Sequence, residues 1–289
     1  MLVLFTDTDT DMSLELANQM GWNLICMPYT INDKTIYPYI DYDKFNAKEF
    51  YDILRGGVVP KTFALNPNNY IEYFEPHLKA GNDILYVHFS KNMSGTFNSL
   101  NIAINELKEQ YPNNTIYTID TKGVSICSLN IIYEIDKLIK NNTYIEEVLK
   151  WAKNEVDHFA TYFYADNLNF FKASGRVSNM SANLGNIFGI HPIIHMSEEG
   201  KLVNIAKVKG KKASLRRLMQ YVEELGDNIK DYKVLIAQTD AYDLASILKQ
   251  NLKEIYGEDL DTEIVEVNPT IGAHCGPDCI GVCFHSKSR

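Results

Sequence analysis

Residues 83–99, DILYVHFSKNMSGTFNS, contain the pattern that decides the fold. Residues 83–89 are rich in β-branched and aromatic side chains, which favours a buried strand. The polar residues 90–95 then predict a loop, and the following spacing predicts a helix through about Gln110. A strand, a loop and a helix in this order form the repeating unit of an α/β protein.

The same unit recurs on both sides of this stretch. Strands are expected at residues 2–5, 23–31 and 115–119. Helices are expected at residues 13–21, 46–55, 66–81 and 124–141, several with a capping side chain before them or a glycine after them. Successive units of this kind imply right-handed crossovers and a parallel sheet, with loops at the strand ends as the default ligand sites.

The pattern changes after about Val156. Residues 189–196 and 201–209 resemble two strands joined by a four-residue turn at 197–200, which favours an antiparallel hairpin. Further strands are expected at residues 159–165, 232–237, 262–267 and 279–284. We therefore expect an α/β protein of two domains: residues 1–156 with a parallel sheet, and residues 157–289 with a mixed or antiparallel sheet.

Composition narrows the class of protein. The chain has 289 residues, of which 45% are hydrophobic and 22% are charged, enough to bury one large or two medium cores. It has no apolar run near the roughly 18 residues that span a bilayer and no signal-peptide pattern, which favours a soluble cytoplasmic protein. The net charge of -9 argues against a nucleic-acid partner, because such a field repels phosphate.

Three hydroxyl groups lie in loops where a ligand site is expected. Ser94 is suited to the N-cap of the helix that follows it, and a helix start also favours an anion, so the two roles are compatible. Thr62 is a turn hydroxyl in its ordinary interpretation, and Ser125 begins the helix after residues 120–123.

Two further side chains have both an ordinary and a functional interpretation. Arg176, in a loop that precedes an expected helix, is either a solvated surface group or a clamp for a carboxylate. His274, in a tight turn near the C-terminus, is either structural or a group that bonds a ligand. Sequence spacing leaves both questions open.

Metal and nucleotide sites are not expected. Cys275, Cys279 and Cys283 recur every four residues without the paired C-x-x-C of structural zinc sites, and reduced thiols are expected. Asp7, Asp9 and Asp11 alternate as at the start of a calcium loop, but the glycine and distal glutamate are missing, so a turn is expected. The glycine motifs of dinucleotide enzymes, P-loop kinases and α/β-hydrolases are absent.

A basic cluster stands out in this acidic chain. Its ordinary interpretation is a solvated face, and its functional one is a docking site for an acidic partner. The cluster consists of Lys201, Lys207, Lys209, Lys211, Lys212, Arg216 and Arg217.

Five motifs, in order along nearly the whole chain, resemble those of the DegV family of bacterial fatty-acid-binding proteins, which includes the fatty acid kinase B subunits. They are Thr6-Asp7-Thr8-Asp9-Thr10-Asp11-Met12, similar to D-S-x-x-D-L; Ser94-Gly95-Thr96-Phe97-Asn98-Ser99, similar to S-G-T-[YF]-x-S; Gly175-Arg176-Val177-Ser178, similar to G-R-I-S; Leu184-Gly185 through Pro192-Ile193-Ile194; and His274-Cys275-Gly276-Pro277.

The resemblance implies two α/β domains that enclose a long-chain fatty acid, as a bound ligand and without a metal or another cofactor. It also implies a protein that is not an enzyme and presents the carboxylate to a separate fatty acid kinase catalytic subunit, for acyl-phosphate and phospholipid synthesis. The positions that match the carboxylate site are Thr62, Ser94, Gly95, Thr96, Arg176 and His274.

Four positions depart from the pattern of the family. Phe63 replaces a serine, His191 a lysine and Lys209 an arginine. Asp278 replaces a glycine, so we expect it either to strain its turn or to place a carboxylate near His274.

Two other classes of function compete with a binding protein. In the first, an enzyme, His274 would activate Ser94 as a nucleophile for acyl transfer or hydrolysis of a lipid-like substrate. The nucleophile elbow and an acidic group to orient the histidine are missing from the sequence. In the second, a regulatory protein, the lipid would be only a structural ligand.

Overall fold

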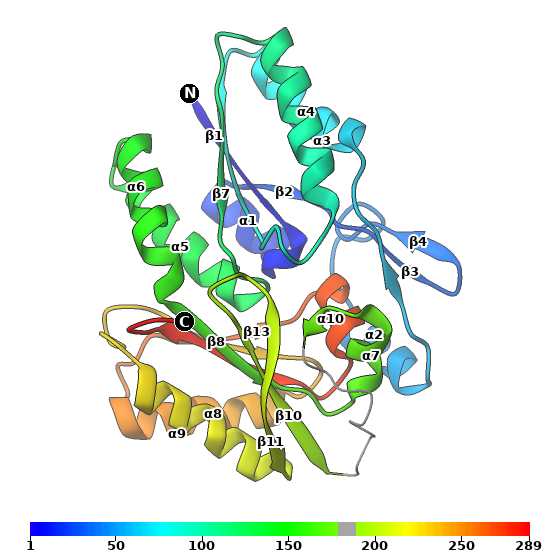
Figure 1. Cartoon of the computed structure of the whole chain (residues 1–289), viewed down its shortest axis with the longest axis vertical. Helices are drawn as coiled ribbons and strands as arrows, with labels where there is room; N and C mark the ends of the chain where they lie inside the picture. The colour runs from blue at the N-terminus through cyan, green and yellow to red at the C-terminus, as the bar shows by residue number, and fades with distance from the viewer. Residues whose placement is uncertain (179–188) are drawn as a thin grey trace.

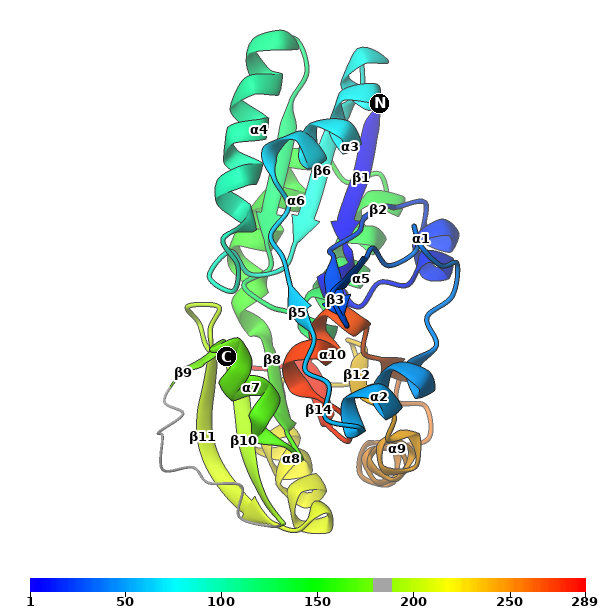
Figure 2. The ribbon, with the colours of Figure 1, turned by 90° about the vertical axis from the view of Figure 1, so that its right-hand side faces the viewer.

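The first half of the molecule contains the parallel sheet that the sequence predicts. The computed structural model describes residues 1–178 and 189–289. Within these ranges the sheet has four parallel strands, in the order β2 (Asn23–Ile25), β1 (Leu2–Asp7), β6 (Asp83–His88) and β7 (Ile116–Asp120). Figures 1 and 2 show that β1 and β6 run toward the centre of the molecule, so the loops after them lie there.

Helices cover both faces of this sheet because successive side chains of a strand point in opposite directions. Ile84 and Tyr86 of β6 share a core with α3 and α4, whereas Leu85 and Val87 pack on the other face with α1 and α5. No helix in the described part of the chain is long and apolar enough to cross a membrane. Around this sheet lie α1 (Leu14–Met20), α3 (Pro67–Lys79), α4 (Thr96–Gln110) and α5 (Ile126–Lys140), and α6 (Ile145–Glu155) packs against α5.

The second half contains a mixed sheet, also as expected. The turn at residues 197–200 joins β10 to β11 as an antiparallel hairpin, while β12 and β13 pair in parallel. In the described ranges the strand order is β13 (Thr262–Glu266), β12 (Val234–Gln238), β14 (Ile280–His285), β8 (Phe159–Tyr164), β10 (Ile190–Met196), β11 (Leu202–Lys209) and β9 (Val177–Ser178).

The two faces of the second sheet have different coverings. Val282 and Phe284 of β14 pack on one face with α8 (Lys211–Leu225) and α9 (Tyr242–Tyr256). Cys283 points to the opposite face, where α5 packs against β8, β12 and β14. The helix α5 precedes residue 156 in the chain but contributes to the core of the second sheet. The division into residues 1–156 and 157–289 stays a prediction.

One expected strand is two separate strands. Residues 23–31 divide into β2 of the parallel sheet and β3 (Tyr29–Ile31), which belongs to a small antiparallel sheet. Pro28 lies between them and has no N–H to donate, so the ladder cannot continue through it. The small sheet also contains β4 (Lys34–Ile36) and β5 (Lys61–Thr62). In the sequence, α2 (Ala47–Arg55) lies between these two strands.

A buried carboxylate joins the two halves. The turn predicted at residues 6–11 is a short 3-10 helix, η1 (Thr8–Thr10), followed by Asp11. Asp11 accepts hydrogen bonds from the Ser125 hydroxyl at the start of α5 and from the Asn268 N–H, 3.0 Å away, at the start of α10 (Pro269–Cys275). Three segments far apart in the sequence therefore meet at one side chain.

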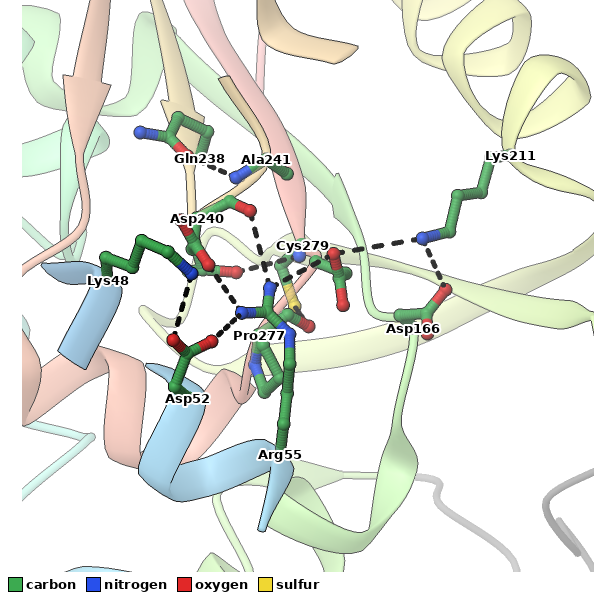
Figure 3. A network of polar contacts seen from close by, with 12 residues as sticks. Lys48, Asp52, Arg55, Asp166, Lys211, Gln238, Asp240, Ala241, Pro277 and Cys279 are labelled. Atoms are coloured by element: carbon green, nitrogen blue, oxygen red, sulfur yellow. Dashed lines mark hydrogen bonds and ion pairs between the residues drawn. The ribbon is translucent and has the colours of Figure 1, made fainter. Parts of the chain in front are cut away.

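A network of ion pairs fixes α2 against the loops of the second sheet (Figure 3). Arg55 pairs with Asp240 and with Asp278, the latter at 3.4 Å. Lys211 extends the network to Asp166 at 3.4 Å and approaches Asp278 at 3.9 Å. The carboxylate of Asp278 therefore contacts Arg55 and Lys211. Of the two alternatives for Asp278, the structure favours the strained turn, because its φ of +63° lies in the left-handed region.

The tip of the β10–β11 hairpin is bound to the loop that leads to Ser94. The Ser90 hydroxyl donates to the Gly200 carbonyl at 2.7 Å, and the Asn92 amide donates to the Glu199 carbonyl at 2.6 Å. A Cβ at position 200 would lie 2.3 Å from Ser90 Oγ, so only glycine allows this approach.

Gly276 ends α10 in a conformation that excludes other residues. Its φ of 72° and ψ of -177° lie in a region that is nearly restricted to glycine. A Cβ at this position would also lie 2.3 Å from the ring of Phe170 in α7 (Leu168–Ser174), which packs against α10. The glycine of the H-C-G-P motif is thus explained by the packing of two helices.

We expect Gly276→Ala to lower the free energy of unfolding by at least about 3 kcal/mol, because backbone strain and the overlap with Phe170 add. Gly21→Ala is the matched control, since Gly21 has a φ of 80° but open space around it. It should cost only about 1 kcal/mol. Urea unfolding of both variants measures the difference, and equal losses would contradict the packing argument.

Candidate functional site

The helix α10 lies between the two halves, as Figure 2 shows. His274, which the sequence places in a tight turn, lies in the last turn of this helix. Asn268 caps the helix and Pro269 follows at its first turn. Tyr51 of α2 donates to the Val267 carbonyl at 2.9 Å and helps to hold this segment in place.

His274 and Thr62 form a hydrogen-bonded pair. His274 Nε2 lies 3.0 Å from Thr62 Oγ1, although the two residues are 212 positions apart. Burial and, to a smaller extent, the positive charge of Arg176 together lower the pKa of His274 to about 4, so the ring is neutral near pH 7. A neutral ring that donates from Nε2 leaves the Thr62 hydroxyl free to donate its own proton to a ligand.

Ser94 and Gly95 lie at the start of α4. The N-cap is Gly95, so the prediction that Ser94 is the N-cap is wrong by one position. Ser94 Oγ accepts a hydrogen bond from the Thr96 N–H at 3.2 Å, which leaves the Ser94 hydroxyl proton available. The positive end of the α4 dipole adds to the attraction for an anion at this place.

Thr96 does not face the site. Its side chain is fully buried, its Oγ1 accepts from the Leu65 N–H at 3.1 Å, and it shares a hydrogen bond of 2.9 Å with the Tyr70 hydroxyl. These contacts give Thr96 a role in packing α3 and the loop before it against α4.

The other expected site residues meet at one polar cavity. Arg176, which is exposed, reaches it from the loop after α7, and Phe63 forms part of its wall. The cavity is lined by Asp9, Met27, Thr62, Phe63, Ala64, Phe89, Met93, Ser94, Gly95, Val124, Arg176, Thr270, Ile271 and His274.

An apolar cavity adjoins the polar one, on the face of the second sheet opposite α8 and α9. Met93, Val124, Arg176, Ile271 and His274 line both, so the two spaces meet at these side chains. The remaining lining is Ser125, Ile126, Thr161, Phe163, Phe171, Met196, Leu202, Ala237, Thr239, Val267, Cys275, Cys279, Ile280 and Gly281. An apolar space with polar groups at one end only suits an amphiphile with one polar head.

Sequence reasoning did not identify the apolar cavity or Asp9. The signal for the cavity is present in the strand alternation, because Ala237 and Gly281 are small residues on the face opposite α8 and α9. The sequence predicts that Asp9 lies in a turn, and this is confirmed. The turn also places Asp9 in the wall of the polar cavity.

The remaining candidates lie elsewhere. His191 is buried beside Ser214 and stacks on Tyr164, and Lys209 is exposed at the end of β11; neither lines the two cavities. Leu184, Gly185 and the helix expected after Ser178 lie outside the described residues.

The cysteines of the C-terminal segment belong to the cavity wall and the core. Cys275 and Cys279 line the apolar cavity, and Cys283 packs beneath α5. Among the residues that the structure describes, no group of three or more His, Cys, Asp or Glu side chains is arranged to hold a metal ion.

Comparisons with known proteins agree with this architecture. A family model described as an uncharacterised protein of the DegV family, COG1307, matches residues 1–287. A DegV domain-containing protein of Clostridium perfringens is 32% identical over 287 residues, which cover 99% of this chain and 98% of the relative.

Solved structures with the same fold include proteins described as lipid-binding. A fatty-acid-binding DegV family protein from Streptococcus agalactiae matches with a TM-score of 0.84 and 25% identity, over 100% of this chain and 99% of the other. A stearic-acid-binding protein from Eubacterium ventriosum matches with a TM-score of 0.88 and 18% identity, over 99% of both chains.

Proposed function

The chain belongs to the DegV family, and from this premise we propose that it binds a long-chain fatty acid. The acyl chain would occupy the apolar cavity and the carboxylate the polar one. The observation that carries the proposal is the junction of the two cavities at His274, which gives one continuous space an apolar and a polar end. The proteins from Streptococcus agalactiae and Eubacterium ventriosum, described as binding fatty acids, support it.

The apolar cavity would supply most of the binding free energy. Each methylene moved from water into an apolar cavity contributes about 0.8 kcal/mol, and the cost of ordering the flexible chain offsets part of this gain. The contacts of the carboxylate then decide the orientation of the ligand.

The polar cavity offers donors for a carboxylate. The Thr62 hydroxyl is oriented by His274, and the Ser94 hydroxyl lies at the positive end of α4. Arg176 adds a cation at the edge of the same cavity. These groups provide a local attraction in a protein whose net charge is -9.

We further propose that the protein presents its ligand to a fatty acid kinase catalytic subunit in the cytoplasm, for acyl-phosphate and phospholipid synthesis. An open groove beside Ser94 is lined by the cations Lys91, Arg176 and Lys201. Positive charge at the mouth of the carboxylate site suits a phosphoryl donor and an acidic partner surface.

The contacts of Ser94 do not favour the hydrolase alternative. In the described part of the chain His274 Nε2 is paired with Thr62, and the side-chain hydrogen bond of Ser94 is with the Thr96 N–H. A serine nucleophile needs a base within hydrogen-bond reach, and among residues 1–178 and 189–289 no base is hydrogen-bonded to Ser94.

We expect Ser94→Ala to weaken fatty acid binding about ten- to a hundredfold, because a hydrogen bond to a charged group contributes about 1.5 to 3 kcal/mol. Native mass spectrometry of purified protein, with extraction and chromatography of the released lipid, measures retention. Ser99→Ala on the same helix lines neither cavity and should retain the lipid. Equal lipid content in both variants would refute the site, and a wild-type protein that takes up no fatty acid would refute the function.

We expect Ala237→Phe to shift the preferred ligand to shorter acyl chains, because the ring would fill part of the apolar cavity. Excluding two methylenes already corresponds to about 1.6 kcal/mol, or about tenfold in relative affinity. Competition between fatty acids of different length measures the ratio. The exposed Ala80→Phe is the control, and an unchanged ratio in Ala237→Phe would place the acyl chain elsewhere.

We expect the bound acid to be phosphorylated when a fatty acid kinase catalytic subunit and ATP are added. The measurement is conversion of a labelled fatty acid to acyl-phosphate, trapped with hydroxylamine. Replacing Lys91 and Lys201 together by Glu should slow this conversion without changing lipid retention, because the charge at the mouth is reversed. If the lipid is retained but not converted, fatty acid binding stands and the proposed delivery to a kinase is wrong.

A further inference from the structure

A carboxyl group faces the proposed carboxylate site. Asp9, in the middle of η1, lines the polar cavity together with Thr62, Ser94 and His274. Two carboxylates in one cavity would repel each other strongly, because few water molecules remain to screen them. The presence of Asp9 therefore needs an explanation if the ligand is an acid.

Asp9 differs from the two acidic residues on either side of it. Asp7 accepts hydrogen bonds from the Tyr86 hydroxyl at 2.9 Å and from the N–H of Asp9 itself at 3.0 Å. Asp11 is bound by Ser125 and Asn268. These two carboxylates have structural partners, and Asp9 is the member of the three that lines the cavity.

The carboxyl of Asp9 has unused bonding capacity. Its Oδ1 is buried and has no hydrogen-bond partner among the residues of the described ranges. The neighbouring Thr270 hydroxyl lies 3.4 Å from the Met27 carbonyl, to which it can also donate. A buried polar atom without a partner is costly, and a ligand that supplies one removes that cost.

The surroundings of Asp9 favour its neutral form. Burial raises its pKa well above the ordinary value, the charges of Asp7 and Asp11 raise it further, and the nearby Thr270 hydroxyl lowers it. The groups that face it from other elements are Thr270 and the neutral His274 of α10, the Tyr70 and Tyr86 hydroxyls of α3 and β6, and Arg176 at the edge of the cavity.

We propose that the carboxyl group of Asp9 is part of the ligand site and shares one proton with the carboxyl group of the bound fatty acid. This inference rests on the proposed function and names the ionisation state of its ligand. The protonated Asp9 donates an O–H···O hydrogen bond to the carboxylate, while Thr62 and Ser94 donate to the remaining lone pairs. The pair then carries a single negative charge, which Arg176 faces.

The proposal predicts that a proton is taken up when the ligand anion binds. Where Asp9 is ionised in the empty cavity, one proton must enter from solution with each carboxylate that binds. Binding of the ligand anion therefore weakens as the pH rises through the titration of Asp9, by about tenfold per pH unit above it. A site that holds an unshared carboxylate with hydroxyls and an arginine has no such dependence.

The test is the affinity for a fluorescent fatty acid with a free carboxyl group, measured between pH 6 and pH 9 below the concentration at which it forms micelles. We expect the wild-type protein to lose affinity toward pH 9. We expect Asp9→Asn, which keeps a donor and lacks the charge, to bind with little dependence on pH and more tightly than the wild type at pH 9. Asp43→Asn, an exposed carboxyl in the same half, is the control and should follow the wild type.

Calorimetry in buffers of different ionisation enthalpy counts the protons taken up by the wild-type protein and needs no variant. Proton uptake that rises with pH supports the proposal, and it keeps the test open if Asp9→Asn does not fold. The same pH profile for the wild type and Asp9→Asn, or no uptake by the wild type up to pH 9, would overturn the shared proton and leave fatty acid binding intact. A wild-type protein that binds no fatty acid at any pH would instead refute the proposed function.

Discussion

The carboxylate of Asp11 joins three parts of the chain, and the position of the site depends on this contact. Its partners are the Ser125 hydroxyl at the start of α5 and the Asn268 N–H at the start of α10. Burial raises the pKa of Asp11 to about 7, although the hydrogen bonds from Ser125 and Asn268 act in the opposite direction. The carboxylate thus sets the distance between the end of β1 and α10, which carries His274. Residues beside this contact line both cavities: Ser125 and Val267 the apolar one, and Asp9 and Thr270 the polar one.

Much of the fold could be predicted from local sequence because caps, glycines and strand composition act over a few residues. Ser13 and Gly21 bound α1, and Asn66 with Pro67 begins α3, as expected. The partners of an element across the molecule could not be predicted in the same way. The packing of α5 on the second sheet depends on contacts with strands that come later in the chain, and no local pattern encodes such contacts.

For the candidate site too, the sequence predicts which residues are involved better than it predicts how they pack. Motifs identified Thr62, Ser94, Arg176 and His274, which the fold brings to one cavity. Thr96 belongs to the same motif as Ser94, but the helix turns its side chain to the interior, so membership of a motif did not predict its direction. The apolar cavity could not be predicted because it lies between one face of the second sheet and residues of α7 and α10. The alternation of side chains along a strand predicts the two faces of a sheet but not which helices cover them.

The contact between the hairpin tip and the Ser90 loop separates the shape of the groove rim from its charge. Ser90 and Asn92 hold the tip at Gly200 and Glu199, while Lys91 and Lys201, beside these bonds, line the rim of the open groove. Both acceptors are backbone carbonyls, so the path of the chain at the rim does not depend on the side chains of the two lysines. The position of the rim and its positive charge are therefore determined by different groups.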